Sequence, residues 1–211
     1  MKKENACLRI GMENKKLSKV FRLKSYILPL CICILIAACN QTSTTTVATK
    51  TYFDVPGFFK EEITQLQKDS MIVIKTSSVN ETSDVHQIDW TNWYRELILF
   101  INSDINKPAF IGKYAVDTIV QDSTSKIITY AATDSSLKTR LLEVTFNTAT
   151  NSVFQIHIIN NTKDFLSSTH EELYFLPMKA YVIKSSQTML FFGTNEMKVM
   201  GKIRGREKKY F

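Results

Sequence analysis

The stretch THEELY gathers the only histidine in this sequence that stands directly beside two acids, His170 with Glu171 and Glu172. Adjacent residues of a strand point to opposite faces, so only His170 and Glu172 would share a face. Such a pair could bind a metal ion or move a proton, and the alternative is a solvated sheet face. We favour the solvated face, and we predict no catalytic residue, no metal site and no cofactor.

Four aromatic residues are the candidates for contact with a ligand. Trp90 and Trp93 could stack on sugar rings, but their spacing inside an apolar helical stripe favours core packing. Phe191 and Phe192 lie in TMLFFG, which is typical of a buried strand, with an exposed ligand-insertion loop as the alternative. The sequence therefore gives four low-ranking candidates and no ligand identity.

The common catalytic motifs are missing from the sequence. It has no glycine-rich phosphate loop, no His-Glu-x-x-His and no Gly-x-Ser-x-Gly, and it holds only six glycines. Two classes of function stay open. We favour a non-enzymatic binding or structural module, and the alternative is an enzyme whose residues are scattered over several strands.

The N-terminal stretch has the pattern of an export signal. Residues 2–24 are strongly basic, and residues 26–38 form an apolar run that ends at Cys39. This run is shorter than the ~20 residues that a membrane-spanning helix needs, and it contains Pro29. A basic flank, a short apolar core and small residues at the exit predict a secretory signal.

The exit Ile36-Ala37-Ala38-Cys39 resembles the lipobox of bacterial lipoproteins. The resemblance implies cleavage before Cys39 and acylation of that cysteine, which would anchor the protein in a membrane. We divide the chain into a signal peptide (1–38), a Thr-rich tether (39–51), one folded domain (52–204) and a basic tail (205–211). Translation would start at Met1 or at Met12.

Removing the signal peptide changes the charge of the protein. The chain has 27 basic and 20 acidic residues; residues 1–38 hold eight and two of these, which leaves 19 and 18 and a net charge of about +1. The near-neutral body removes the argument for nucleic-acid binding. The basic residues near the C-terminus are either a solvated end or a contact with anionic lipid head groups.

The remaining segments predict an α+β domain. Residues 54–70 and 89–108 have apolar residues at helical spacing, with Asp54 and Asp89 as caps and Pro108 as a stop. Residues 71–79 and 80–89 predict a hairpin. Short, often alternating segments follow near 110–120, 126–133, 137–147, 153–160, 166–176, 179–190 and 196–204. We expect a curved antiparallel meander of about seven or more strands, with the two helices on its apolar face.

The layout of these segments resembles a group of small Bacteroidota lipoproteins. The residues that carry this likeness are YFDVPGFFKEEITQL and DWTNWYRELILFINSDINKP, placed behind a lipobox and before a meander. The resemblance implies an outer-membrane lipoprotein, and it assigns no catalytic residue. Surface display in Bacteroidota lipoproteins resembles a rule that requires acidic residues soon after the lipidated cysteine. The stretch NQTSTTTVATKTYF has none before Asp54, so we expect the domain to face the periplasm. Helices held in a curved sheet also resemble carriers and receptors of the Lol type, in architecture alone.

An apolar cleft between the sheet and the second helix is the most specific functional expectation. Two short helices can cover only part of a seven-stranded sheet, and the chain is rich in large aromatic residues. Such a cleft would hold a hydrophobic ligand or a protein partner beside the membrane. The alternative is a closed core with no cleft.

Cys39 is predicted to be the lipidated N-terminus of the mature protein. Two or three acyl chains would anchor it stably, at ~0.8 kcal/mol for each methylene buried. Intact-mass measurement of the membrane-extracted protein should show a diacyl or triacyl modification on Cys39. An unmodified mature form in the soluble fraction would contradict the prediction.

Overall fold

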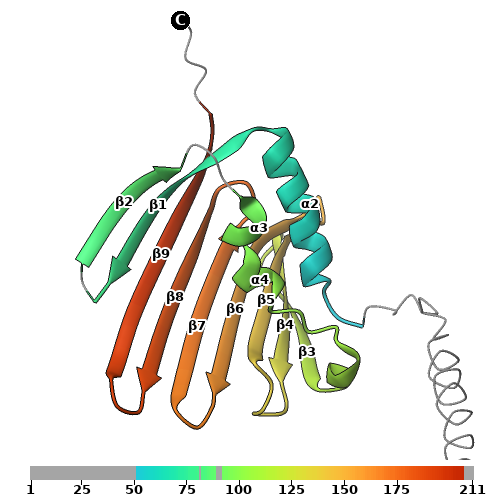
Figure 1. Cartoon of the computed structure of the whole chain (residues 1–211). Helices are drawn as coiled ribbons and strands as arrows, with labels where there is room; N and C mark the ends of the chain where they lie inside the picture. The colour runs from blue at the N-terminus through green and yellow to red at the C-terminus, as the bar shows by residue number, and fades with distance from the viewer. Residues whose placement is uncertain (1–50, 81, 89–91, 207–211) are drawn as a thin grey trace, which may run out of the picture. The chain divides into compact units, whose positions relative to one another are not determined.

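The computed structural model describes residues 51–80, 82–88 and 92–206. The elements, labelled in Figure 1, are α2 (Val55–Lys68), β1 (Met71–Val79), β2 (Thr82–Ile88), α3 (Trp93–Glu96), α4 (Ile98–Ile101), the 3-10 helix η1 (Pro108–Phe110), β3 (Tyr114–Val120), β4 (Ser125–Ala132), β5 (Thr139–Asn147), β6 (Val153–Lys163), β7 (Ser167–Leu176), β8 (Ala180–Met189) and β9 (Gly193–Gly205). All of them belong to one compact unit, residues 49–211.

The nine described strands form one antiparallel sheet. Its order is β2-β1-β9-β8-β7-β6-β5-β4-β3, so β3 to β9 form a meander and the β1–β2 hairpin joins the sheet beside β9. The predicted α+β class and the meander are therefore confirmed. The predicted hairpin at 71–89 is also present, with Val79 opposite Thr82 at its tip.

The helices lie on one face of the sheet and close an apolar core there. Phe59 of α2 and Phe100 of α4 meet Phe175 of β7, with ring centroids 4.9 and 5.7 Å apart. Phe59 and Phe100 also contact each other at 5.3 Å. All three side chains are fully buried. Such tilted and edge-on contacts are favourable arrangements for aromatic pairs, so this cluster fixes the helices to the sheet.

Helix α2 begins where the sequence predicts, directly after Asp54. The Asp54 side chain accepts a hydrogen bond from the Gly57 N–H at 3.1 Å, which caps the helix as expected. Farther along α2, Glu62 accepts a bond from the backbone N–H of Met178 at 2.7 Å. This bond joins the helix to the β7–β8 turn, and burial raises the pKa of the Glu62 carboxyl.

The second predicted helix is wrong in its length. The structure has two short helices separated at Leu97. Asn92 caps α3 by accepting from Arg95 N–H at 3.1 Å, and α4 begins after Leu97 without a side-chain cap. The expected cap Asp89 lies outside the described residues. The helical run ends early because the Ser103 hydroxyl bonds to Leu99 O, so a side chain competes for the backbone well before Pro108.

Asn106, from the motif DINKP, fixes the point where the chain enters the domain. Its Oδ1 accepts from Tyr52 N–H at 2.9 Å, and its Nδ2 donates to Phe53 O at 2.9 Å. The Tyr52 hydroxyl in turn accepts from Gly112 N–H at 2.8 Å. The segment before α2 is thereby attached to the loop that precedes β3.

A polar cluster joins helix α3 to strands β8 and β1. The Tyr181 hydroxyl of β8 donates to Glu96 of α3 at 2.6 Å, and Lys75 of β1 pairs with Glu96 at 2.8 Å. Burial raises the pKa of Tyr181, which keeps its hydroxyl protonated as a donor. Gly201 lies opposite Tyr181 in the ladder, and a Cβ there would lie 2.1 Å from the Tyr181 ring.

No helix among residues 51–80, 82–88 and 92–206 has the length and apolar character needed to cross a membrane.

We predict that Gly201→Ala destabilises the domain. The added methyl would overlap the buried Tyr181 ring, so we expect a loss of about 1–3 kcal/mol in the free energy of unfolding. Gly205→Ala is the matched control, because a Cβ there meets nothing within 4 Å. Urea unfolding should separate the two variants, and equal stability would contradict the predicted overlap.

Candidate functional site

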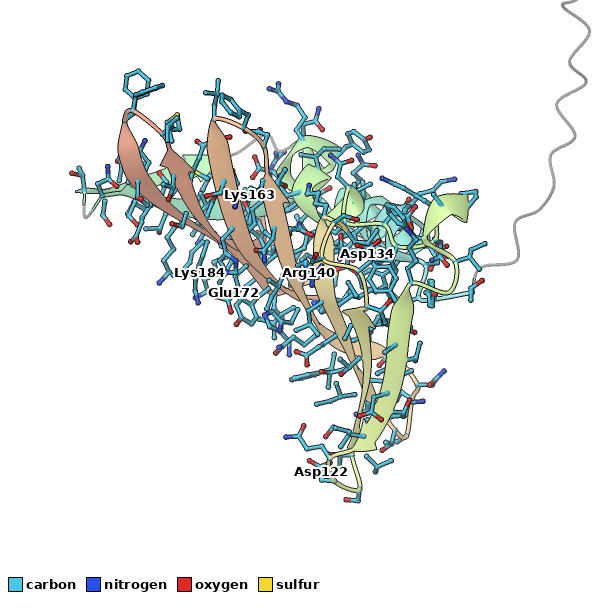
Figure 2. All side chains as sticks on the ribbon, turned by 90° about the horizontal axis from the view of Figure 1, so that it is seen from below. Asp122, Asp134, Arg140, Lys163, Glu172 and Lys184 are labelled. Carbon is cyan, nitrogen blue, oxygen red and sulfur yellow. The ribbon has the colours of Figure 1, made fainter. Side chains whose placement is uncertain are left out.

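The face of the sheet away from the helices carries most of its polar chemistry. Residues opposite one another in the ladder form rows across the strands on this face. One row holds Glu143, His157 and Tyr174; the next holds Glu172, Lys184 and Lys198. Figure 2 shows Glu172 and Lys184 on the opposite side of the sheet from the helices. Side chains from β5 to β9 therefore meet on one surface although they lie far apart in sequence.

His157 lies between two carboxylates in this surface. Its Nδ1 is 2.8 Å from Glu143 Oε2, and its Nε2 is 3.5 Å from Glu172 Oε1. The imidazole stacks on the Tyr174 ring, with centroids 4.4 Å apart and planes within 4°. The Nε2 atom has no contact with solvent and no hydrogen bond. Nε2 is inaccessible to a substrate and Nδ1 is occupied by Glu143, so we interpret His157 as a link between strands.

Glu172 is the centre of this cluster. It accepts from Lys184 at 2.8 Å and from the Tyr174 hydroxyl at 2.5 Å. The bond from Lys184, followed by that from Tyr174, lowers the pKa of Glu172 to about 2. The same bond raises the pKa of Tyr174 to about 12, because ionised Tyr174 would repel the carboxylate. Glu172 therefore stays ionised and Tyr174 stays protonated across the physiological pH range.

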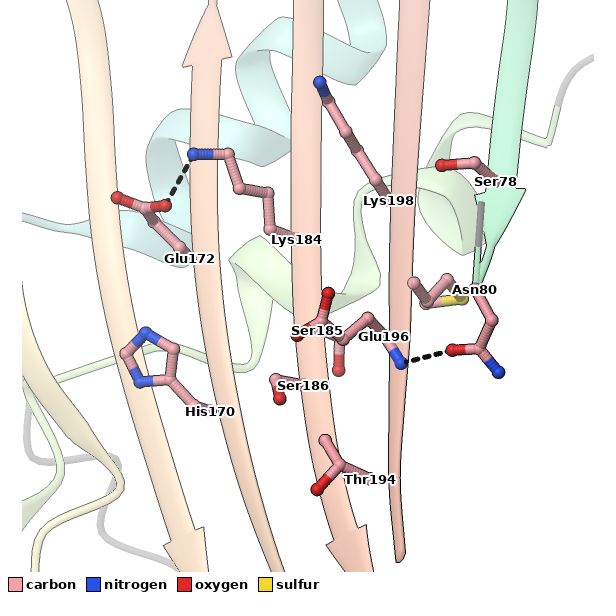
Figure 3. Close-up of a pocket in the computed structure, with 11 residues that line it drawn as sticks. Ser78, Asn80, His170, Glu172, Lys184, Ser185, Ser186, Thr194, Glu196 and Lys198 are labelled. Carbon is pink, nitrogen blue, oxygen red and sulfur yellow. Dashed lines mark hydrogen bonds and ion pairs between the residues drawn. The ribbon is translucent and has the colours of Figure 1, made fainter. Parts of the chain in front are cut away.

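A groove opens beside this cluster, with a volume of ≈ 660 Å³. Volumes of about 300–1,000 Å³ are usual for small-molecule sites. Figure 3 shows the groove residues in front of the sheet, with the helices behind it. They come from β1, β7, β8 and β9 and the turn after β1, and they are Ser78, Asn80, His170, Glu172, Lys184, Ser185, Ser186, Thr194, Glu196, Met197 and Lys198.

The charges in the groove fall into two groups. Lys184 is neutralised by Glu172, at a distance of 2.8 Å. Lys198 and Glu196 are exposed, and neither forms an ion pair within the part of the chain that the structure describes. Figure 3 shows the Lys198 side chain extending along the strand, away from Glu196. As far as the described residues are concerned, the groove therefore offers Lys198 as a free cation and Glu196 as a free anion to a ligand.

His170 and Glu172 share a face, as the sequence predicts, and both line the groove. The structure does not join them. His170 Nδ1 lies 2.6 Å from Asn161 Oδ1, whereas Glu172 bonds to Lys184 and Tyr174. Ser186 stands opposite His170 in the ladder, without a hydrogen bond between their side chains among the described contacts. Alternation alone indicates the shared face, but it cannot indicate these cross-strand partners.

The four candidate aromatic residues separate in the structure. Trp93 is 2% exposed and belongs to the core, and Trp90 lies outside the described residues. Phe191 and Phe192 are each 81% exposed in the turn between β8 and β9. The expectation of a buried strand at TMLFFG is wrong, because the strand ends at Met189 and the turn projects both rings outward. The alternative of an exposed loop is the one observed.

Within residues 51–80, 82–88 and 92–206, no group of three or more His, Cys, Asp or Glu side chains could hold a metal ion. Cys39 and the residues of the predicted lipobox, Ile36 to Ala38, lie outside this part of the chain.

No protein-family model and no curated protein matches the sequence. Among solved structures, the chain is similar to the S-type phycobiliprotein lyase CPES from Guillardia theta, at 8% sequence identity and a TM-score of 0.24. The match covers 72% of this chain and 99% of that chain. A TM-score this low carries no argument about function. The resemblance to Bacteroidota lipoproteins stays a prediction.

Glu172→Gln should destabilise the domain in a pH-dependent way. The lowered pKa means that ionised Glu172 stabilises the fold fully above its ordinary pKa of 4.5, and that this contribution fades as the pH falls toward about 2. We expect a loss of about 1 kcal/mol at pH 7 that shrinks over that range. Chemical unfolding at several pH values would measure it.

Glu196→Gln is the control for this experiment, because Glu196 forms no ion pair with a described residue and should behave like the parent protein at every pH. A pH-independent deficit in Glu172→Gln would contradict the assignment.

Proposed function

We propose that this chain is a lipid-anchored module of the bacterial envelope that binds a polar ligand on the helix-free face of its sheet. The anchor is the predicted acylation of Cys39, and the outer membrane with a periplasmic domain is the proposed location. The observation that carries the binding part is the groove with Lys198 and Glu196, neither of which forms an ion pair with a described residue. This proposal replaces the expected apolar cleft with a polar site on the other face.

The close packing of the apolar core favours a polar ligand on the free face over an apolar ligand under the helices. The residues that would have lined a cleft under the helices, Phe100, Ile105 and Phe175 among them, are fully buried against one another. The groove, in contrast, presents carboxylate, ammonium, hydroxyl and amide groups. Specific polar groups placed in a concave surface fix the orientation of a ligand.

The spacing of the free charges narrows the ligand class. Lys198 and Glu196 are two residues apart on one strand and one face, so their Cα atoms are about 7 Å apart. A ligand with an anionic group and a cationic group at a similar spacing would meet both. The hydroxyls of Ser78 and Ser186 add hydrogen-bonding positions for amide or hydroxyl groups. A short zwitterionic peptide has this chemistry.

An enzymatic role has one observation in its favour. Asn161, His170 and Ser186 stand in one row on neighbouring strands, and Asn161 orients His170 through Nδ1. A hydroxyl, a histidine and an orienting amide are parts of a nucleophilic site. The backbone N–H groups of this row, however, face along the sheet and are not gathered toward the groove. Binding without turnover is therefore the better account.

The test is binding of short zwitterionic peptides to the full chain, measured by native mass spectrometry in mild detergent. The double variant Glu196→Ala/Lys198→Ala should bind at least about tenfold more weakly, because two charge-assisted hydrogen bonds are lost. Lys60→Ala/Glu61→Ala removes the same charges from the exposed side of α2 and should bind like the parent.

Three results would count against the proposal. Equal binding by both double variants would remove the groove as the site. Release of a bound acyl lipid in place of a polar species would favour the apolar cleft. Conversion of the peptide that disappears in Ser186→Ala would favour the enzyme.

A further inference from the structure

Two neighbouring hairpin tips expose an unusual amount of apolar side chain. The β6–β7 turn carries Phe165 and Leu166, which are 91% and 56% exposed. The β8–β9 turn carries Leu190, Phe191 and Phe192, at 63%, 81% and 81%. A hydrogen bond from Leu190 N–H to Leu166 O, at 3.0 Å, joins the two turns. These five residues, which we name the tip cluster, form one continuous projection.

Three of the five backbone N–H groups of the tip cluster, those of Leu166, Leu190 and Phe192, donate hydrogen bonds within the two turns. Asp164 Oδ1 accepts from Leu166 N–H at 3.2 Å and from Ser167 N–H at 2.8 Å. Phe192 N–H donates to Met189 O at 3.2 Å. Because backbone groups without partners are strongly unfavourable in hydrocarbon, these bonds lower the penalty for insertion, and the N–H groups outside these bonds favour the hydrated head-group region over the hydrocarbon core.

The tip cluster lies at the ends of the strands, on the side of the sheet where the chain enters the domain. We call this side the entry edge. Alternate turns of an antiparallel meander share an edge, so the β4–β5, β6–β7 and β8–β9 turns lie together, along the lower edge in Figure 1. The loop before β3 joins this edge through Thr133 N–H to Lys113 O at 2.9 Å. Tyr52 is bonded to Gly112 in that loop.

From these observations we infer that the tip cluster inserts into the head-group region of the membrane that carries the predicted anchor. This inference rests on the proposed function only in taking a membrane as the neighbouring surface. Only eleven residues (40–50) separate Cys39 from Thr51, and this segment spans at most ~40 Å when fully extended. An anchor at Cys39 would therefore limit the distance from the bilayer to Thr51 to about this length, which the tip cluster can bridge by turning toward the lipid.

The shape and charge of the cluster favour a bilayer over a protein partner. The rings project from convex turns, which a deformable lipid phase can surround, whereas protein hot spots usually fill a matching pocket. Exposed Lys163 stands at the end of β6 beside the tips and suits lipid phosphate. Asp164 is ionised, with its pKa lowered by bonds from Ser167, which limits insertion to the interfacial depth.

Fluorescence quenching tests the orientation directly. The full lipidated chain carrying Phe191→Trp is reconstituted in phosphatidylethanolamine and phosphatidylglycerol vesicles with brominated acyl chains. Val120→Trp is the matched control, because Val120 is 67% exposed at the opposite edge of the sheet. We expect the emission added by Phe191→Trp to shift to shorter wavelength and to be quenched, and that of Val120→Trp to stay unquenched.

An unquenched Phe191→Trp on vesicle-bound protein would overturn the inference. Quenching of Val120→Trp would also overturn it, because the opposite ends of the strands, where β9 ends at Gly205, would then face the lipid.

A second experiment separates the tips from the anchor. In full-length Cys39→Ser protein, Phe191→Asp/Phe192→Asp should weaken vesicle binding at least about tenfold relative to Val116→Asp/Val120→Asp. Residues 1–50 are identical in the two proteins, so their own affinity for lipid cancels. Equal vesicle binding by the two double variants would overturn the inference. It would also be overturned if the protein formed a dimer that Phe191→Asp/Phe192→Asp dissociates and Val116→Asp/Val120→Asp does not. Peptide binding in the groove should persist in all of these variants, which distinguishes failure here from failure of the proposed function.

Discussion

The packing of Phe59 and Phe100 on Phe175 is the contact on which the rest of the structure depends. It attaches both helical segments to the centre of the sheet and buries the apolar face. The bond from Tyr181 to Glu96 extends this attachment to the strands nearer β1. Because one face is occupied in this way, the proposed ligand site lies on the opposite face, and the ends of the strands stay exposed.

The free face of the sheet and the exposed turns differ in chemistry. Strand pairing determines which side chains meet on the free face. On the free face, cross-strand rows bring Glu172 next to Lys184 and leave Lys198 and Glu196 available. At the edge, the turns after β6 and β8 project apolar side chains instead. A polar groove and an apolar edge on one small domain are suited to a module that binds a hydrophilic ligand close to a membrane.

Much of the fold could be predicted because the signals are local. Asp54 caps α2 as expected, and the alternation of Leu142, Glu143 and Val144 indicates which side chains face the core. The break at Leu97 could not be predicted, since the apolar stripe continues through it. The exposed turn at Phe191 could not be predicted, because an apolar run has the same composition in a buried strand and in an exposed turn.

The site was harder to predict than the fold because it depends on register. His157, Glu172 and Lys184 belong to three strands, and no local pattern states which residues will lie opposite one another. The shared face of His170 and Glu172 was predictable from their spacing. Their separate partners, Asn161 and Lys184, were not.

The central claim is that the helix-covered face is a closed core and that apolar molecules meet the domain only at its edge. A titration of methyl-labelled protein with a twelve-carbon fatty acid, followed by NMR, tests it most directly. The account predicts that the methyl signals of Leu142, Ile156 and Leu173, all fully buried, stay unchanged while those of Leu166 and Leu190 respond. Saturable shifts of the three core residues would contradict it.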